Sequence, residues 1–367
     1  MENTKRQSNF ELLRIAAMIM IILFHVQIHG PQPLLNECFA FPTICKRLIL
    51  FEIGIPLGAI GNGLFMMISG YFMSARTDID TGKIAKKLLL QLGFATIVLM
   101  LAYALWITFF KNETLSWDTV TIADFNNSWW YIGYYMIVIV IAKLFFNKLI
   151  SRLSQKQFCA LLFTLLAITQ FGWSGNLLDS LADGLRTVFI GIFFFGVGGY
   201  IARYNPFGNV RLYTVFLILG AAYAVRFLSA YNIVSDAIDD YIKSDSEGNF
   251  IRSVQGYADW EIAVVIFVIF FFELFRRINI PYSRIINYIG SSTLMIYIIH
   301  ENGFFQSFYR NDSWMEALIK SCPGYCAMWL KWTAAAFGAG LLAYIIYSIL
   351  EKLLPKISIL FIKKEAD

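Results

Sequence analysis

Residues 11–30 read ELLRIAAMIMIILFHVQIHG, a stretch long and apolar enough to cross a membrane as one helix. It carries two side chains that lipid disfavours, Arg14 near its start and His25 eleven positions later. Eleven residues at 100° each complete three turns and about 20°, so these side chains share one helix face, about 16 Å apart along the axis. Ionisable residues inside a membrane helix usually face the bundle interior and take part in function.

The rest of the chain has the same membrane character. Of its 367 residues, 58% are hydrophobic and only 15% are charged, whereas soluble proteins average about 25% charged residues. We expect an all-α integral membrane protein, a polytopic bundle of about ten transmembrane helices that forms a single domain over residues 1–367 with no soluble domain. The expected spans are residues 10–29, 48–73, 86–110, 128–150, 157–173, 185–203, 210–231, 257–275, 285–303 and 324–354. The ninth is only moderately apolar, so we expect it to be broken, tilted or partly interfacial.

The distribution of charge indicates the orientation. With the N-terminus in the cytoplasm, most of the 30 lysines and arginines fall on the inner side and most of the 25 acidic residues on the outer side. Both termini are then cytoplasmic. Because the positive total reflects the inner loops, we expect no nucleic-acid partner.

Each polar residue in the first helix also has a simpler interpretation. Arg14 could be an anchor that reaches the interface, and His25 could make an interhelical hydrogen bond. His29, followed by Gly30 and Pro31, is expected at the interface. Two histidines four residues apart, without a carboxylate or thiolate, do not complete a zinc site, so we expect no metal.

Four motifs carry a resemblance to a known family. FELLRIAAMIMIILFH (residues 10–25), with its Arg-x10-His spacing, resembles the first helix of the membrane-bound acyltransferase 3 family, and GNGLFMMISGYF (61–72) is similar to its second. WWYIGYYM (129–136) and IYIIHE (296–301) fit as later landmarks in the same order. The similarity covers most of the chain.

The resemblance implies a bacterial enzyme that O-acylates cell-surface sugars. Such an enzyme takes an acyl group, commonly acetyl, from acyl-CoA and passes it to a hydroxyl of a carbohydrate or lipid-linked glycan. Acyl-CoA is then a co-substrate, no cofactor is bound permanently, and the protein lies in the bilayer of the bacterial cytoplasmic membrane. The resemblance also ties Arg14 and His25 to activity.

The donor needs cations at the inner surface. Arg14 is one candidate, and the loop SARTDIDTGKIAKK (74–87) supplies four more, Arg76, Lys83, Lys86 and Lys87. Membrane topology alone also explains these four. Ser69 lies beside the expected donor path, either as a covalent acyl carrier or as a small packing residue.

We expect His25 to act as general base on the acceptor hydroxyl, with Arg14 binding or orienting the donor. Transfer through an acyl-imidazole is the rival chemistry, and the sequence does not separate the two.

The acceptor is expected to arrive from outside. Aromatic rings suit both the interfacial belt and the apolar faces of a sugar. The residues expected to bind the acceptor are Glu52, Trp129, Trp130, Tyr131, Tyr297 and His300, and further acidic candidates at outer helix ends are Asp259, Glu261 and Glu301.

Two other classes of function remain open on the sequence. Polar stripes in a bundle equally suit a transporter or flippase for a glycan or lipid-linked sugar, although no inverted repeat is evident. A scaffold without chemistry would leave the pairing of Arg14 and His25 unexplained. Homo-oligomerisation is also left open.

Overall fold

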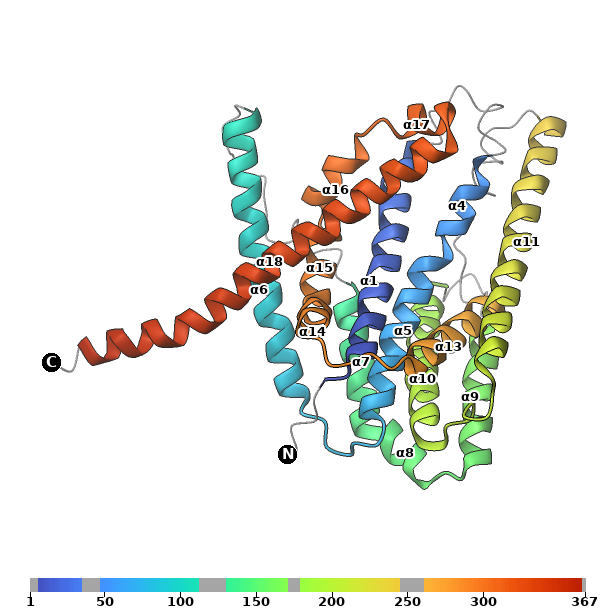
Figure 1. Cartoon of the computed structure of the whole chain (residues 1–367), viewed down its shortest axis with the longest axis horizontal. Coiled ribbons are helices and arrows are strands. Elements are labelled where there is room, and N and C mark those ends of the chain that lie inside the picture. The colour runs from blue at the N-terminus through green and yellow to red at the C-terminus, as the bar shows by residue number, and fades with distance from the viewer. Residues whose placement is uncertain (1–5, 35–46, 112–129, 171–178, 245–260, 365–367) are drawn as a thin grey trace.

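The structure is a computed structural model that describes residues 6–34, 47–111, 130–170, 179–244 and 261–364. Within this part of the chain every regular element is helical and no strand occurs. Figure 1 shows one bundle with α1 (Ser8–His29) near its centre. The remaining helices are α2 (Pro31–Leu34), α4 (Ile49–Gly54), α5 (Pro56–Met73), α6 (Thr81–Trp106), η3 (Ile107–Lys111), α7 (Trp130–Ile141), η5 (Ala142–Phe146), α8 (Asn147–Arg152), α9 (Gln155–Gln170), α10 (Asp179–Tyr204), α11 (Leu212–Ser244), α13 (Ile262–Arg277), α14 (Arg284–Ser291), α15 (Thr293–His300), α16 (Gly303–Arg310), α17 (Trp314–Lys320) and α18 (Cys322–Lys364).

The expected multi-pass architecture is confirmed, with an approximate helix count. Seven helical stretches among the described residues are long and apolar enough to cross a membrane: Ser8–Leu34, Ile49–Met73, Thr81–Lys111, Trp130–Arg152, Gly184–Tyr204, Leu212–Asp236 and Cys322–Leu353. Within the described residues, the other three expected spans contain shorter helices: α9 and α13 have 16 residues each, and α14 and α15 have 8 each.

The ninth expected span is broken, as its composition suggested. α14 ends at Ser291 and α15 begins at Thr293. At the break, the Ser292 hydroxyl donates to the Ile289 carbonyl at 2.7 Å, and the Thr293 hydroxyl donates to the Gly290 carbonyl at 3.0 Å. Such bonds compete with the helical ladder, which explains why two short helices replace one long one.

Glycines bring the central helices into close contact. A Cβ on Gly61 of α5 would lie 2.6 Å from the Ala17 carbonyl oxygen of α1, and one on Gly70 would lie 1.8 Å from the Phe195 carbonyl oxygen of α10. Only glycine fits either contact, because a side chain would have to displace backbone. Small residues therefore let α5 approach both neighbouring helices closely.

The helix α1 joins two apolar cores. Its residues Leu13 and Ala17 pack with α5 and α10, whereas Ile22 and Val26 pack with α15 and α18. On the opposite side of α15, Gly340 of α18 allows close approach, because a Cβ there would lie 2.4 Å from the Ile296 Cα. The backbone that carries His25 and the backbone that carries His300 are thus both held by dense packing.

Candidate active site

A cavity of about 280 Å³ lies along the N-terminal half of α1. It is lined by Arg6, Arg14, Met18, Ile21, Phe65, Ser69, Ile84, Lys87, Leu88, Gln91, Tyr131, Ile132, Tyr135, Gly290, Ser291, Thr293, Leu294 and Tyr297. On α1 the lining residues follow helical spacing, and the next position on that face after Ile21 is His25. On α15 the face that carries Tyr297 likewise continues to His300 and Glu301. Two helix faces therefore lead from the cavity towards the histidines.

Arg14 lies in this cavity as one member of an ion pair. Its Nη1 donates to Oε1 of Glu11 at 2.8 Å, and Arg6 Nε lies 3.9 Å from the same oxygen. Glu11 is buried, and Gly290 makes room for it, because a Cβ there would lie 2.3 Å from Glu11 Oε2. The carboxylate fixes the Arg14 guanidinium while its other donors remain available to the cavity.

The structure divides the expected donor-binding residues into two groups. Lys87 and Ser69 line the cavity, whereas Arg76, Lys83 and Lys86 are exposed and do not line it. The Ser69 hydroxyl donates to the Phe65 carbonyl at 2.9 Å, one helical turn earlier.

Two tyrosines that line the cavity, Tyr131 and Tyr297, pack against each other, and we call this pair the tyrosine wall. The Tyr131 backbone N–H donates to the Tyr297 hydroxyl at 3.4 Å, and the two ring centroids are 5.7 Å apart. The Tyr131 hydroxyl is buried and has no hydrogen-bond partner among the described residues. Beyond this wall, the Tyr297 and His300 ring centroids are 5.6 Å apart. One tyrosine thus contacts both the cavity and the histidine cluster.

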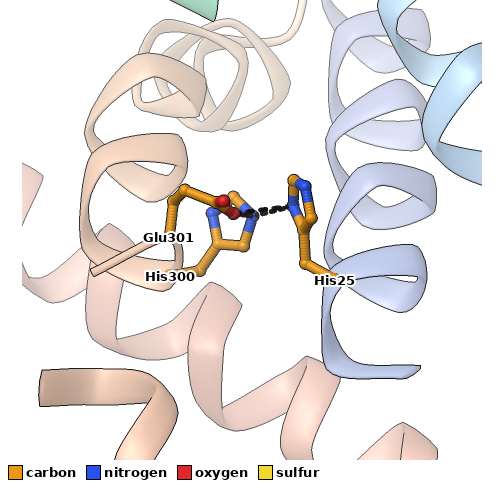
Figure 2. Close-up of side chains that lie close together, drawn as sticks. All are labelled: His25, His300 and Glu301. Atoms are coloured by element: carbon orange, nitrogen blue, oxygen red, sulfur yellow. Dashed lines mark hydrogen bonds and ion pairs between the residues drawn. The ribbon is translucent and has the colours of Figure 1, made fainter. Parts of the chain in front are cut away.

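The buried cluster consists of His25, His300 and Glu301 (Figure 2). His25 Nδ1 lies 2.9 Å from His300 Nε2 and 2.9 Å from Glu301 Oε2. Glu301 Oε2 is close to His25 but makes no aligned hydrogen bond, so this carboxylate acts on the imidazole mainly through its charge. His29 lies at the edge of the cluster, with its Nε2 3.9 Å from Glu301 Oε1.

The contacts of His300 fix the tautomer of His25. His300 Nδ1 lies 3.0 Å from the Ile296 carbonyl, which can only accept, so Nδ1 carries the His300 proton. His300 Nε2 must then accept, and His25 Nδ1 must donate to it. Neutral His25 therefore keeps its lone pair on Nε2, the nitrogen that points away from the cluster (Figure 2). A buried carboxylate beside such an imidazole is the arrangement of a general base.

The same three residues also have the donor types of a metal site. Their nearest ligand atoms all lie within 4.8 Å of one another. However, His25 Nδ1 lies 2.9 Å from His300 Nε2, a hydrogen-bond length, and 2.9 Å from Glu301 Oε2. Both separations are shorter than the roughly 3.4 Å between ligands at 2.0–2.1 Å from a tetrahedral zinc. The spacing favours a shared proton, and the expected absence of a metal stays a prediction.

The structure brings some of the expected acceptor-binding residues together, through ring contacts that run from Trp130 to His300, but not Glu52. Tyr131, Tyr297 and His300 lie at or next to the tyrosine wall, and Trp130 is exposed at the start of α7. Trp129 lies outside the described residues. Glu52 is buried elsewhere, where its Oε2 accepts from Arg226 Nη2 of α11 at 3.1 Å in a separate pocket.

Two carboxylates have larger parts in the site than the sequence indicated. Glu11 was not singled out, although its position three residues before Arg14 was a signal for an ion pair on one helix face. Glu301 was expected only among acidic residues near the outer surface. Glu301 directly follows α15 and lies next to His25 because of the way α15 packs in the bundle. A sequence pattern does not specify such packing.

Comparisons with known proteins agree with this geometry. A family model of the acyltransferase 3 family, described as an acyltransferase domain, matches residues 7–348, a range that includes Arg14, His25, His300 and Glu301. No curated protein and no solved structure gave a match. The match favours acyl transfer over the alternatives of transport and scaffolding. The chain belongs to the acyltransferase 3 family and is a membrane acyltransferase.

Proposed function

We propose that this protein moves an acyl group, most simply acetyl, from cytoplasmic acyl-CoA to a hydroxyl of an extracytoplasmic or lipid-linked carbohydrate. The observation that carries the proposal is the state of His25, whose Nδ1 lies 2.9 Å from both His300 Nε2 and the buried Glu301 carboxylate, while its Nε2 keeps a lone pair. No resident cofactor is required for this chemistry.

In the proposed reaction, His25 Nε2 accepts the proton of the acceptor hydroxyl as that oxygen attacks the thioester carbonyl carbon. A carbon–oxygen bond forms, the carbon–sulfur bond breaks, and the departing thiolate takes the proton from the imidazolium. General-base assistance of this kind is typically worth about 10² to 10⁴ in rate. Glu301 stabilises the transient positive charge, and transfer through an acyl-imidazole remains the rival.

The donor is proposed to enter from the cytoplasmic side, so that its acyl end occupies the cavity beside Arg14. Arg14, already oriented by Glu11, binds or orients that donor. Because Tyr131 and Tyr297 stand between this cavity and the histidine cluster, the thioester reaches His25 only when the two tyrosines separate. The acceptor approaches from the opposite side of the membrane.

The test uses purified protein, radiolabelled acetyl-CoA and surface glycan from the host cell. The parent should produce a labelled ester that base releases, whereas His25→Ala and Arg14→Ala should not. Lys83→Ala, at an exposed position outside the cavity, is the control and should behave as the parent. Transfer by His25→Ala at the parental rate would rule out the assigned role of His25. Failure of the parent to transfer label from any acyl-CoA would rule out the proposed donor.

A further inference from the structure

A second cavity, of about 380 Å³, lies next to the start of α1. It is lined by Arg6, Gln7, Ser8, Asn9, Arg276, Arg277, Ile278, Asn279, Ile280 and Tyr282. We refer to it as the arginine cavity, because three arginines and no acidic residue line it. All three arginines belong to the side that the charge distribution assigns to the cytoplasm.

Arg6 connects the arginine cavity with the cavity beside Arg14, since it lines both. Its guanidinium donates to the Ser291 hydroxyl and, at 3.3 Å, to the Asn287 carbonyl, so it is positioned at the junction. From Ser8, the first residue of α1 and a lining residue of the arginine cavity, to Arg14 is six residues, about 9 Å along the helix. A long ligand with charge at one end could therefore extend from one cavity into the other.

Arg276 and Arg277 differ in their hydrogen-bond partners in the arginine cavity. Arg277 donates to the Phe207 and Val210 carbonyls and to Glu273, and thereby ties the loop between α10 and α11 to α13. Arg276 bonds Glu273 and Asn205 through Nε and Nη2 and also interacts with the Tyr71 hydroxyl, so these contacts use four of the five N–H donors of its guanidinium. Arg276 is thus held in place but retains a donor for a ligand.

Hydrogen bonds hold the backbone around the arginine cavity in place, and the start of α1 there favours binding of an anion. The Ser283 N–H donates to the Ser8 hydroxyl at 2.8 Å, and the Asn9 side chain donates to the Phe275 carbonyl at 3.1 Å. These bonds hold the first turn of α1 against the α13–α14 connection. The N-cap residue Gln7 makes no side-chain capping bond, so the positive end of the α1 dipole faces the cavity uncapped.

Five cations line the two cavities: Arg6, Arg14, Lys87, Arg276 and Arg277. The salt bridges to them come from two carboxylates, Glu11 and Glu273. Even when Glu351, whose charge also acts on Lys87, is added, these cations exceed the carboxylates by two. Planar guanidinium groups suit phosphate oxygens, which they bind by charge-assisted hydrogen bonds.

We propose that the arginine cavity binds the phosphate groups of the acyl donor, with Arg6 and Arg276 as the phosphate ligands and the thin acyl-bearing arm running past Arg6 to Arg14. This inference rests on the proposed function, because it takes the donor to be a phosphorylated thioester. The phosphate of an anionic lipid headgroup has the same chemistry, and the test separates the two sources.

The test measures binding of unacylated CoA to purified full-length protein by calorimetry, which requires no acceptor and no catalysis. Arg6→Gln and Arg276→Gln should each weaken CoA binding by about tenfold, the scale of one charge-assisted hydrogen bond. Arg276→Gln, at a residue that does not line the cavity beside Arg14, should leave binding of phosphate-free pantetheine unchanged. Arg76→Gln is the matched control, an exposed arginine that lines neither cavity. Arg276→Lys should recover part of the loss, which separates a charge effect from misfolding.

Each outcome distinguishes this inference from the proposed function. If the parent binds CoA and both variants bind it as tightly as Arg76→Gln does, the arginine cavity is not the phosphate site, although CoA remains the donor. If the parent does not bind CoA, the inference and the proposed donor both fail. If the variants lose retention of phosphatidylglycerol from mixed-lipid nanodiscs while CoA binding is unchanged, the site is a lipid headgroup site and the inference is wrong.

Discussion

Replacing Glu301 by glutamine should slow acyl transfer by about two orders of magnitude without unfolding the protein. The change keeps the size of the side chain and removes its charge. Glu301 Oε2 lies 2.9 Å from His25 Nδ1, and at an effective dielectric constant of about 20 the carboxylate would stabilise a full imidazolium charge at that distance by about 6 kcal/mol.

If roughly half of the proton charge has reached His25 in the transition state, about 3 kcal/mol of stabilisation is lost, or about 100-fold in rate. The effect should appear in kcat, since Glu301 does not line the donor cavity. The assay is the rate of label transfer at saturating acetyl-CoA. Glu316→Gln is the control, because it removes an exposed carboxylate in the first turn of α17. A rate for Glu301→Gln within about threefold of the parent would refute the electrostatic role.

Three further outcomes follow from the contacts described above. Arg14→Lys keeps the charge but removes the planar guanidinium that one bond to Glu11 orients towards the cavity, so KM for the donor should rise several-fold while kcat is retained; an unchanged KM would remove Arg14 from donor binding. Incubation with a chelator should leave transfer unchanged, because His25 Nδ1 is spaced for a hydrogen bond; loss of activity that zinc restores would instead show a metal centre. Gly70→Ala should cost about 3 kcal/mol of stability or prevent folding, because its Cβ would meet the Phe195 carbonyl. The control is Gly93→Ala, which has open space around it. In a thermal unfolding assay this control should be at least as stable as the parent.

Much of the architecture was predictable because lipid imposes a simple rule on sequence. A membrane helix must be apolar for about 20 residues, so the long spans appear directly in the hydropathy. The rule says less about the helices that do not span. The helices α16 and α17 fall in a stretch expected to be a loop, and they are only 8 and 7 residues long, too short for any span signal.

The candidate site was predictable where its residues belong to one helix. Arg14 and His25 lie eleven residues apart on a single element, so helical periodicity alone places both side chains on one face. The proximity of His25 to His300 and Glu301 spans about 275 residues of sequence, and it depends on how α15 packs between α1 and α18. For the same reason, nothing in the sequence indicated that Glu52 would pair with Arg226.

The most direct test of the account is sidedness of transfer in sealed proteoliposomes. Host glycan is enclosed, radiolabelled acetyl-CoA is added outside, and base-labile label on the enclosed glycan is measured for the parent and for His25→Gln. We predict that the parent labels the enclosed glycan and that His25→Gln does not. Equal labelling by both proteins would contradict the role of His25. Labelling only when glycan and acetyl-CoA share a compartment would contradict transfer of the acyl group across the membrane.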